Sequence, residues 1–325
     1  MDLLFLTYNS SEACSFYRCS GIAHHLRKIT GYNISVAQWK DLGELTWGII
    51  SQYDIIFMQR PFGKDAAVIC NYIKDCGKKL WVDYDDNLLA LNPENQNYEL
   101  YNKKEVKLSI VGIINQADAV SVTNEYMRQC FAEFNKNIWV IPNAHNDFLL
   151  KREDLPKREK MVFWRGSQSH IYDLMSHKDI INKCSDEYKD WRFNYMGFYP
   201  WFLKKAENNG FIKGMDIILY FKTLFSLAPS LVQVPLSDDV FNHSKSNISF
   251  LEASYAGAAS LVPAYWNLPN TLLYSNDQEY LDYLYFALKG EFDLKKMAED
   301  SWEFVQEYFL LSKINYKRKQ LIESL

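Results

Sequence analysis

Lys245 and Glu252 are the two side chains whose types and spacing point most directly to chemistry. Apolar residues recur around them at helical spacing, which predicts a helix over residues 245–256 with Glu252 on its apolar face. A carboxylate that points inward is costly unless it is paired, and a lysine in a first helical turn is unfavourable unless an anion binds there. The pair would fit a nucleoside diphosphate, with phosphates at Lys245 and ribose at Glu252. The alternative is a surface lysine and a glutamate paired with a neighbouring arginine.

Other polar clusters each follow a predicted strand, where a parallel sheet binds its ligands. In chain order these clusters are Tyr17 and Arg18, Arg60, Asp83 to Asp86, Arg165 to His170, and Ser237 to Lys245. Because the carboxyl ends of parallel strands share one edge of a sheet, we expect the clusters to converge. Their convergence on one site is stronger evidence than any single cluster.

The elements that must position these residues alternate between short apolar runs and helical patterns. Predicted strands cover residues 3–7, 34–37, 54–58, 79–82, 119–122 and 138–141, and then 162–164, 191–196, 211–214, 231–234 and 261–263. Residues 264–276 are predicted to be a loop. Repeated β–α alternation predicts an α/β fold with two Rossmann-like, doubly wound parallel-sheet domains that face a cleft.

The predicted domains are residues 1–150 and residues 161–305, the second carrying Lys245 and Glu252. Residues 151–160 are rich in charge and have no clear period, which is typical of a linker. Residues 306–325 are predicted to be a helical tail that packs back towards the N-terminal domain.

The composition of the 325 residues excludes several classes of protein. A hydrophobic content of 48% and a charged content of 23% fit a globular chain, and the net charge of −4 does not suit a surface built to coat nucleic acid. The six cysteines are scattered, which favours reduced thiols over zinc ligands. The chain starts directly with a strand and has no membrane-spanning apolar run, so we expect a cytoplasmic protein without integral membrane contact.

Four stretches of this sequence resemble the GT-B glycosyltransferases, especially the family-4 type and its viral and bacterial relatives. They are the opening strand and loop that lead to Tyr17 and Arg18, the segment VDYDDNLLAL, the residues VIPN at 140–143, and the pair FWRGSQSHIYDL and PLSDDVFNHSKSNISFLEASYAGAASLV. The likeness spans most of the chain, and its last stretch is the most specific.

The resemblance implies a nucleotide-sugar donor site in the second domain and an acceptor site mainly in the first. Glu252 matches the ribose-binding glutamate of the family, while Lys245 and Arg165 look like the pair that neutralises the diphosphate. The other donor-side residues implied are Gly166, Ser167, His170, Ser244 and Ser246. Many members carry a second, sugar-contacting glutamate where this chain has Ser244, so the identity of the sugar does not carry over.

Glycosyl transfer builds negative charge on the leaving diphosphate, which Arg165 and Lys245 would stabilise without a metal or other cofactor. Asp83 and Asp85 resemble a metal-binding D-x-D motif, but they lie in the first domain, away from the phosphates. Asp85 or Asp86 is instead predicted to orient or deprotonate the acceptor hydroxyl. Tyr17, Arg18, Arg60 and Asp83 complete the predicted acceptor side. The alternative is that these aspartates cap the next segment or pair with Arg18 or Arg60.

The sequence therefore predicts a metal-independent glycosyltransferase, and the resemblance favours a retaining one. The acceptor stays open between a surface glycan, a hydroxymethylated base of viral DNA, and a protein or small molecule. Frequent Asn, Lys, Ile and Tyr indicate AT-rich codons, which suit a phage enzyme in the host-cell cytoplasm. The alternatives are a GT-B-like protein that binds a nucleotide sugar without transferring it, and a sugar-nucleotide epimerase. The oligomeric state does not follow from the sequence.

Overall fold

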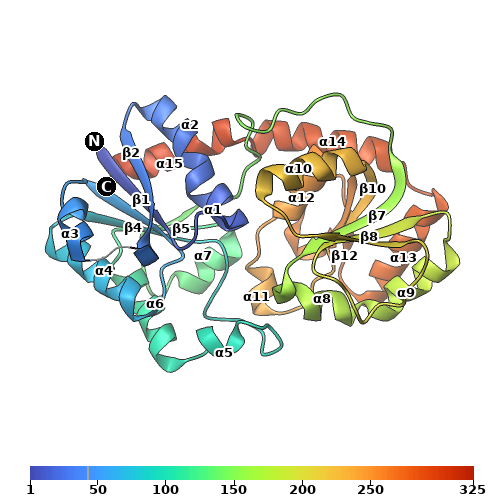
Figure 1. The fold of residues 1–325 in the computed structure, drawn as a ribbon, viewed down its shortest axis with the longest axis horizontal. Coiled ribbons are helices and arrows are strands. Elements are labelled where there is room, and N and C mark those ends of the chain that lie inside the picture. Colours follow the sequence, from blue (N-terminus) through green and yellow to red (C-terminus); the bar gives the residue numbers. More distant parts are fainter. Residues whose placement is uncertain (42–43) are drawn as a thin grey trace.

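The computed structural model describes residues 1–41 and 44–325, and two α/β domains lie side by side in it (Figure 1). The N-terminal sheet has six parallel strands in the order β2-β1-β3-β4-β5-β6. These strands are β1 (Asp2–Thr7), β2 (Asn33–Gln38), β3 (Ile55–Gln59), β4 (Lys79–Tyr84), β5 (Ala119–Val122) and β6 (Ile138–Val140). The strand order reverses between β1 and β3, so ligands are expected at the carboxyl ends of these strands.

The helices of this domain connect successive parallel strands. They are α1 (Ala13–Arg18), α2 (Ser20–Thr30), η1 (Trp39–Asp41), α3 (Glu44–Ile50), α4 (Gly63–Asp75), α5 (Tyr98–Tyr101), α6 (Lys104–Gln116) and α7 (Glu125–Phe131). Both faces of the sheet are covered, because alternate residues of β1 enter different cores. Leu4 and Leu6 pack in one hydrophobic cluster, and Leu3 and Phe5 pack in another.

The C-terminal sheet also has six parallel strands, in the order β12-β11-β10-β7-β8-β9. They are β7 (Glu159–Gly166), β8 (Arg192–Gly197), β9 (Asn209–Lys213), β10 (Pro229–Gln233), β11 (Ala259–Pro263) and β12 (Leu272–Tyr274). The reversal of strand order here lies between β7 and β10. That edge carries Arg165 at the end of β7 and the segment that leads from β10 to Lys245.

The helices of the rest of the chain are numbered on from the first domain. They are η2 (Gln168–His170), α8 (Ile171–Ser176), α9 (Lys178–Glu187), α10 (Ile217–Leu227), α11 (Val240–His243), α12 (Ile248–Tyr255), η3 (Ala264–Trp266), α13 (Asp277–Lys289), α14 (Leu294–Tyr308) and α15 (Leu311–Ser324). None of the helices in the described ranges is both long and apolar enough to cross a membrane.

The chain passes between the domains twice, and the two passages run beside each other (Figure 1). The amide of His145 donates to the carbonyl of Phe309, and the amide of Leu311 donates to the carbonyl of His145, each at 2.8 Å. After the second passage, α15 packs on α2, with Ile314 and Leu321 in the same hydrophobic cluster as β1. The last helix thus belongs to the N-terminal core, although the helix before it packs against α12.

Two local predictions were wrong. The helix predicted from residue 245 begins only at Ile248, so Lys245 lies in the turn before α12 rather than in its first helical turn. Strand β12 lies in the segment predicted to be a loop, because three residues are too few for a strand periodicity to show.

Candidate functional site

Glu252 is buried on α12, and three side chains donate hydrogen bonds to its carboxylate. The Tyr17 hydroxyl donates to Oε1, while the Tyr220 hydroxyl and the Arg165 Nε donate to Oε2, each at 2.7 Å. The carboxylate therefore accepts three hydrogen bonds within the protein, and one of its partners is an arginine. Pairing with a neighbouring arginine was the structural alternative that the sequence left open.

Arg165 is the second-last residue of β7, and its Nε donates to Glu252. Its Nη2 is buried and has no hydrogen-bond acceptor among the described residues. Burial alone would lower the pKa of Arg165, but Glu252, Tyr220 and Tyr17 outweigh it and raise that pKa. A charged, buried nitrogen without an acceptor is costly, so this guanidinium is suited to bind an anion.

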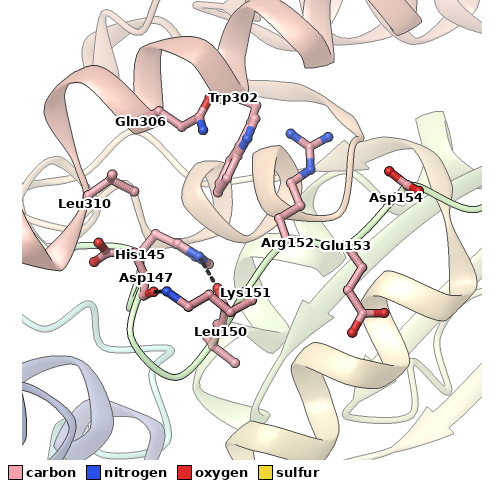
Figure 2. Close-up of a pocket in the computed structure, with 10 residues that line it drawn as sticks. All are labelled: His145, Asp147, Leu150, Lys151, Arg152, Glu153, Asp154, Trp302, Gln306 and Leu310. Carbon is pink, nitrogen blue, oxygen red and sulfur yellow. Dashed lines mark hydrogen bonds between the residues drawn. The ribbon is translucent and has the colours of Figure 1, made fainter.

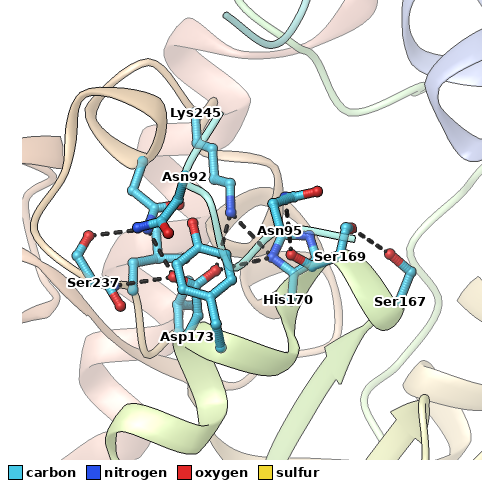
Figure 3. Close-up of polar contacts among 12 residues, drawn as sticks. Asn92, Asn95, Ser167, Ser169, His170, Asp173, Ser237 and Lys245 are labelled. Atoms are coloured by element: carbon cyan, nitrogen blue, oxygen red, sulfur yellow. Dashed lines mark hydrogen bonds and ion pairs between the residues drawn. The ribbon is translucent and has the colours of Figure 1, made fainter. Parts of the chain in front are cut away.

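Lys245 is also buried, and its charge is balanced by a carboxylate that the sequence had not singled out (Figure 3). Its Nζ donates to Asp173 Oδ2 at 3.2 Å and lies 3.1 Å from His170 Nδ1. Burial would raise the pKa of Asp173, but Lys245 and His170 lower it to about 2. Burial and Lys245 lower the pKa of His170 to about 4, so this imidazole is neutral near pH 7.

The remaining predicted donor-side residues lie around this pair in different settings. Ser167 is exposed, and its hydroxyl is 2.7 Å from that of Ser169. A Cβ on Gly166 would lie 2.5 Å from the Trp164 ring, so the packing of Trp164 is sufficient to require glycine there. Ser244 is fully buried and its hydroxyl donates to the Val240 carbonyl, so it does not face a ligand. Ser246 accepts a hydrogen bond from Asn143 of the other domain at 2.8 Å.

The two domains touch each other at the strand ends where the sequence predicted the site. Asn95 Nδ2 donates to the Ser169 carbonyl at 3.2 Å, and Asn92 Nδ2 donates to Asp239 Oδ2 at 3.0 Å. Asn124 Nδ2 donates to the carbonyls of Ser244 and Lys245 at 3.0 Å each. These bonds and the Tyr17–Glu252 bond join the N-terminal domain to η2, to the segment from Asp239 to Lys245, and to α12.

On the N-terminal side, Arg18 and Asp83 form a buried ion pair rather than an exposed acceptor surface. Both Nε and Nη2 of Arg18 donate to the Asp83 carboxylate, and Nη1 donates to the Ile141 carbonyl at 2.7 Å. The Ser121 hydroxyl also donates to Asp83. With exposed fractions of 1% and 2%, neither side chain of the pair can touch an acceptor in this conformation.

Arg60 pairs with both remaining aspartates of the cluster. It contacts Asp85 Oδ1 at 2.7 Å and Asp86 Oδ2 at 3.0 Å, which is again the ion-pair alternative. Burial would raise the pKa of Asp85, but Arg60 and Arg18 hold it below its ordinary value. Burial raises the pKa of Asp86, with Asp85 adding to the rise, while Arg60 and the Lys245 of the other domain oppose it. Asp86 is the more exposed carboxylate and the better proton acceptor of the two.

The structure adds Tyr220 and Asp173 to the site. Asp173 is a carboxylate on the buried face of a predicted helix, so the argument that singled out Glu252 could have found it as well. Tyr220 sits among other aromatic residues on α10 and gave no such signal. Within the described ranges, no group of three or more His, Cys, Asp or Glu side chains is arranged to hold a metal ion.

A cavity of about 620 Å³ lies elsewhere, between the linker and the ends of α14 and α15 (Figure 2). It is lined by His145, Asp147, Leu150, Lys151, Arg152, Glu153, Asp154, Trp302, Gln306 and Leu310. None of the predicted donor or acceptor residues lines it. Its walls carry both signs of charge, so it does not favour an anionic ligand.

Solved structures resemble the whole chain, whereas no protein-family model and no curated protein sequence matches it. An α-glucosyltransferase in complex with UDP gives a TM-score of 0.68 at 9% identity, with 100% of both chains covered. A second structure of an α-glucosyltransferase, with a TM-score of 0.63 at 9% identity and the same full coverage, holds UDP and a 13-mer DNA containing an HMU base. HepE from Anabaena, in complex with UDP, gives 0.67 at 14% identity, again with 100% of both chains covered.

An epimerase is similar as well. The putative UDP-N-acetylglucosamine 2-epimerase from Listeria monocytogenes gives a TM-score of 0.62 at 12% identity, over 99% of this chain and 96% of the other. At these identities the likeness establishes the fold alone. The two six-stranded parallel sheets match GT-B structures, which confirms the predicted fold class.

Proposed function

We propose that the protein is a metal-independent glycosyltransferase that moves a sugar from a nucleoside diphosphate sugar to an acceptor hydroxyl. The observation that carries the proposal is Arg165 at the strand reversal, whose Nε donates to the Glu252 carboxylate while its buried Nη2 has no acceptor among the described residues. Lys245 Nζ lies 3.1 Å from His170 Nδ1, and both Lys245 and Arg165 lower the pKa of His170, which supports a shared site for the two cations. A diphosphate there would satisfy both cations, and Glu252 would receive the ribose hydroxyls.

The donor we propose is a uridine diphosphate sugar. Its support is the full-length likeness to proteins whose structures hold UDP. The structure that holds DNA with an HMU base supports a modified DNA base as the acceptor, with a surface glycan as the alternative. The six free cysteines fit a reducing compartment, so we propose that the reaction takes place in the cytoplasm.

In the proposed reaction the bond between the sugar and the diphosphate breaks, and the acceptor oxygen bonds to the sugar. Arg165 and Lys245 stabilise the charge that develops on the diphosphate. Asp86 takes the acceptor proton, since it is the more exposed carboxylate of its pair and its pKa is raised. Arg60 keeps this carboxylate in place.

A sugar-nucleotide epimerase is the second candidate, because the Listeria protein shares the fold over nearly the whole chain. An epimerase needs carboxylates at the sugar, where this chain has Ser244. That serine is buried and bonded back to α11, which favours transfer over epimerisation.

Nucleotide binding tests the proposal. We expect UDP and one UDP-sugar to raise the melting temperature equally with and without EDTA, since a ligand at 100 times its dissociation constant adds roughly 2.7 kcal/mol of stability. Arg165→Ala, Lys245→Ala and Glu252→Ala should each remove most of that rise. Arg128→Ala is the matched control, because Arg128 is an exposed arginine that pairs with Glu125 on α7. A wild-type protein that no nucleotide stabilises would overturn the proposed function.

Asp86→Asn tests the acceptor side. It should leave the UDP dissociation constant within about twofold and lower the transfer rate by about a hundredfold or more, as expected for loss of a general base. The measurement is single-turnover transfer from a radiolabelled UDP-sugar to glycan and to hydroxymethylated DNA acceptors. Full activity in this variant would exclude Asp86 as the base.

A further inference from the structure

Tyr17 belongs to the N-terminal domain, yet its side chain lies in the core of the other domain. Together with Phe16 it packs in the hydrophobic cluster that contains Phe221 and Tyr220. The next residue, Arg18, is fixed in the N-terminal domain through Asp83. Helix α1 therefore bridges the domains, with its aromatic side chains on one side of the boundary and its guanidinium on the other.

The close packing of α1 on α2 fixes where Tyr17 points. A Cβ on Gly21 would lie 2.2 Å from the Phe16 carbonyl oxygen, so only glycine allows this approach. Between the two helices, Cys19 departs from helical geometry, with φ −133° and ψ −83°. The Tyr17 hydroxyl therefore reaches Glu252 from the N-terminal domain.

The donors on Glu252 are divided between its two oxygens by domain. Oε2 receives Arg165 and Tyr220, which both belong to the same domain as Glu252. Among the described residues, Oε1 receives a hydrogen bond from Tyr17 alone, which belongs to the opposite domain. Because Oε2 already accepts two hydrogen bonds, a ribose hydroxyl must use Oε1. Oε1 can accept a second hydrogen bond, but Glu252 is only 3% exposed, so a ribose hydroxyl reaches this oxygen only if a side chain that covers it moves, and Tyr17 is the side chain in contact with it.

We propose that the Tyr17 hydroxyl occupies the position of a ribose hydroxyl, so that the nucleotide and Tyr17 compete for Glu252. The inference rests on the proposed function, since it takes Glu252 as the ribose ligand. Nucleotide binding then has to withdraw Tyr17, which carries α1 out of its contact with the C-terminal domain. Tyr17 sets the affinity for the donor from across the domain boundary.

Tyr17→Phe provides the test, because it removes the competing hydroxyl and keeps the ring. A hydrogen bond to a carboxylate is strong enough that its loss from the free protein should lower the UDP dissociation constant about tenfold. Tyr255→Phe is the matched control, since it removes a hydroxyl on the same helix, α12, that donates to the Lys151 carbonyl and does not contact Glu252. It should leave UDP binding unchanged. Isothermal titration with UDP measures both.

Unchanged or weaker binding in Tyr17→Phe would overturn the inference, because Tyr17 would then be neutral or a ligand contact. Equal tightening in both variants would also overturn it, since general loosening of α12 would be the cause. A different outcome would overturn the proposed function itself, namely that the wild-type protein binds no nucleotide at all.

Amide hydrogen exchange distinguishes a tyrosine that competes with the nucleotide from one that has a structural role alone. We expect UDP to speed amide exchange in the wild-type α1 peptide, residues 13–19, as this helix leaves its neighbour. UDP-induced protection of that peptide would contradict the competition.

Discussion

In both halves of the proposed site, buried carboxylates hold the cationic side chains in place. Glu252, Asp173 and Asp83 are each at most 3% exposed, and each pairs with a cation. Removing one partner of such a pair leaves an uncompensated buried charge, which is more damaging than losing a surface pair. The positive charges of the site are balanced in the same way, since Lys245 pairs with Asp173 and Arg165 pairs with Glu252.

His145 leads to a prediction about pH. It is buried between Tyr255 and Trp302, and burial lowers its pKa from 6.5 to about 4. The unfolded chain therefore takes up a proton between about pH 6.5 and pH 4 that the folded protein does not, so stability falls as the pH falls through this range. The loss from His145 alone should be roughly 3 kcal/mol.

His145→Gln should flatten that dependence when urea unfolding is measured between pH 4 and pH 7. His24→Gln serves as the control, because His24 is an exposed histidine. An unchanged pH dependence in His145→Gln would show that other groups account for the loss.

At the scale of elements, α15 determines how the N-terminal core is closed. Its residues Ile314 and Leu321 pack with the first strand of the chain, and Asn315 donates to the Ile22 carbonyl of α2 at 3.2 Å. An amphipathic pattern could predict this helix. It could not predict where the helix packs, because the surface that it covers lies almost three hundred residues away in sequence. Its first neighbour in the chain, α14, packs on the opposite domain.

Arg318 on α15 should be a destabilising residue. It is 1% exposed, and its Nη2 has no partner among the described residues, while Nη1 reaches only Asn315 of the same helix. Burial lowers its pKa to about 9, with Arg18 contributing and Asp83 opposing. We expect Arg318→Met to raise the free energy of unfolding by about 1–4 kcal/mol, as measured by urea denaturation.

Leu321→Ala is the comparison on the same helix, and it should lower that free energy by about 2–5 kcal/mol. A loss of stability in Arg318→Met would instead mean that Asp83 compensates the buried charge.

For the whole molecule, the main question is how tightly the two domains are coupled. Asn124 is central to it, because its Oδ1 caps α7 through the Met127 amide while its Nδ2 donates across the boundary to Ser244 and Lys245. An aspartate there keeps the cap and loses the donor, so only the domain contact is broken.

Asn124→Asp should therefore separate the thermal unfolding of the two domains in calorimetry and speed proteolysis of the linker at residues 151–158. Asn135→Asp is matched to it, since Asn135 Nδ2 donates to two carbonyls, Ile114 and Ala117, inside one domain. That control should destabilise the N-terminal domain without faster cleavage of the linker. Equal cleavage in both variants would argue against Asn124 as a coupling residue.

The sequence by itself determined the α/β class, the two parallel sheets and the neighbourhood of Arg165, Lys245 and Glu252. These features depend on local periodicity and on the rule that the carboxyl ends of parallel strands lie at the same edge of a sheet. It also indicated that Asp83, Asp85 and Asp86 could pair with Arg18 and Arg60, but it could not choose between pairing and catalysis.

Only the tertiary structure decided which partner each charge takes. Asp83 lies with Arg18 and Ser121 from distant segments, and Glu252 meets Tyr17 across the domain boundary, 235 residues away. The start of α12 and strand β12 were likewise missed, because a turn and a three-residue strand carry no periodicity of their own. Pairings between remote segments depend on packing in three dimensions, and spacing along the chain does not encode them.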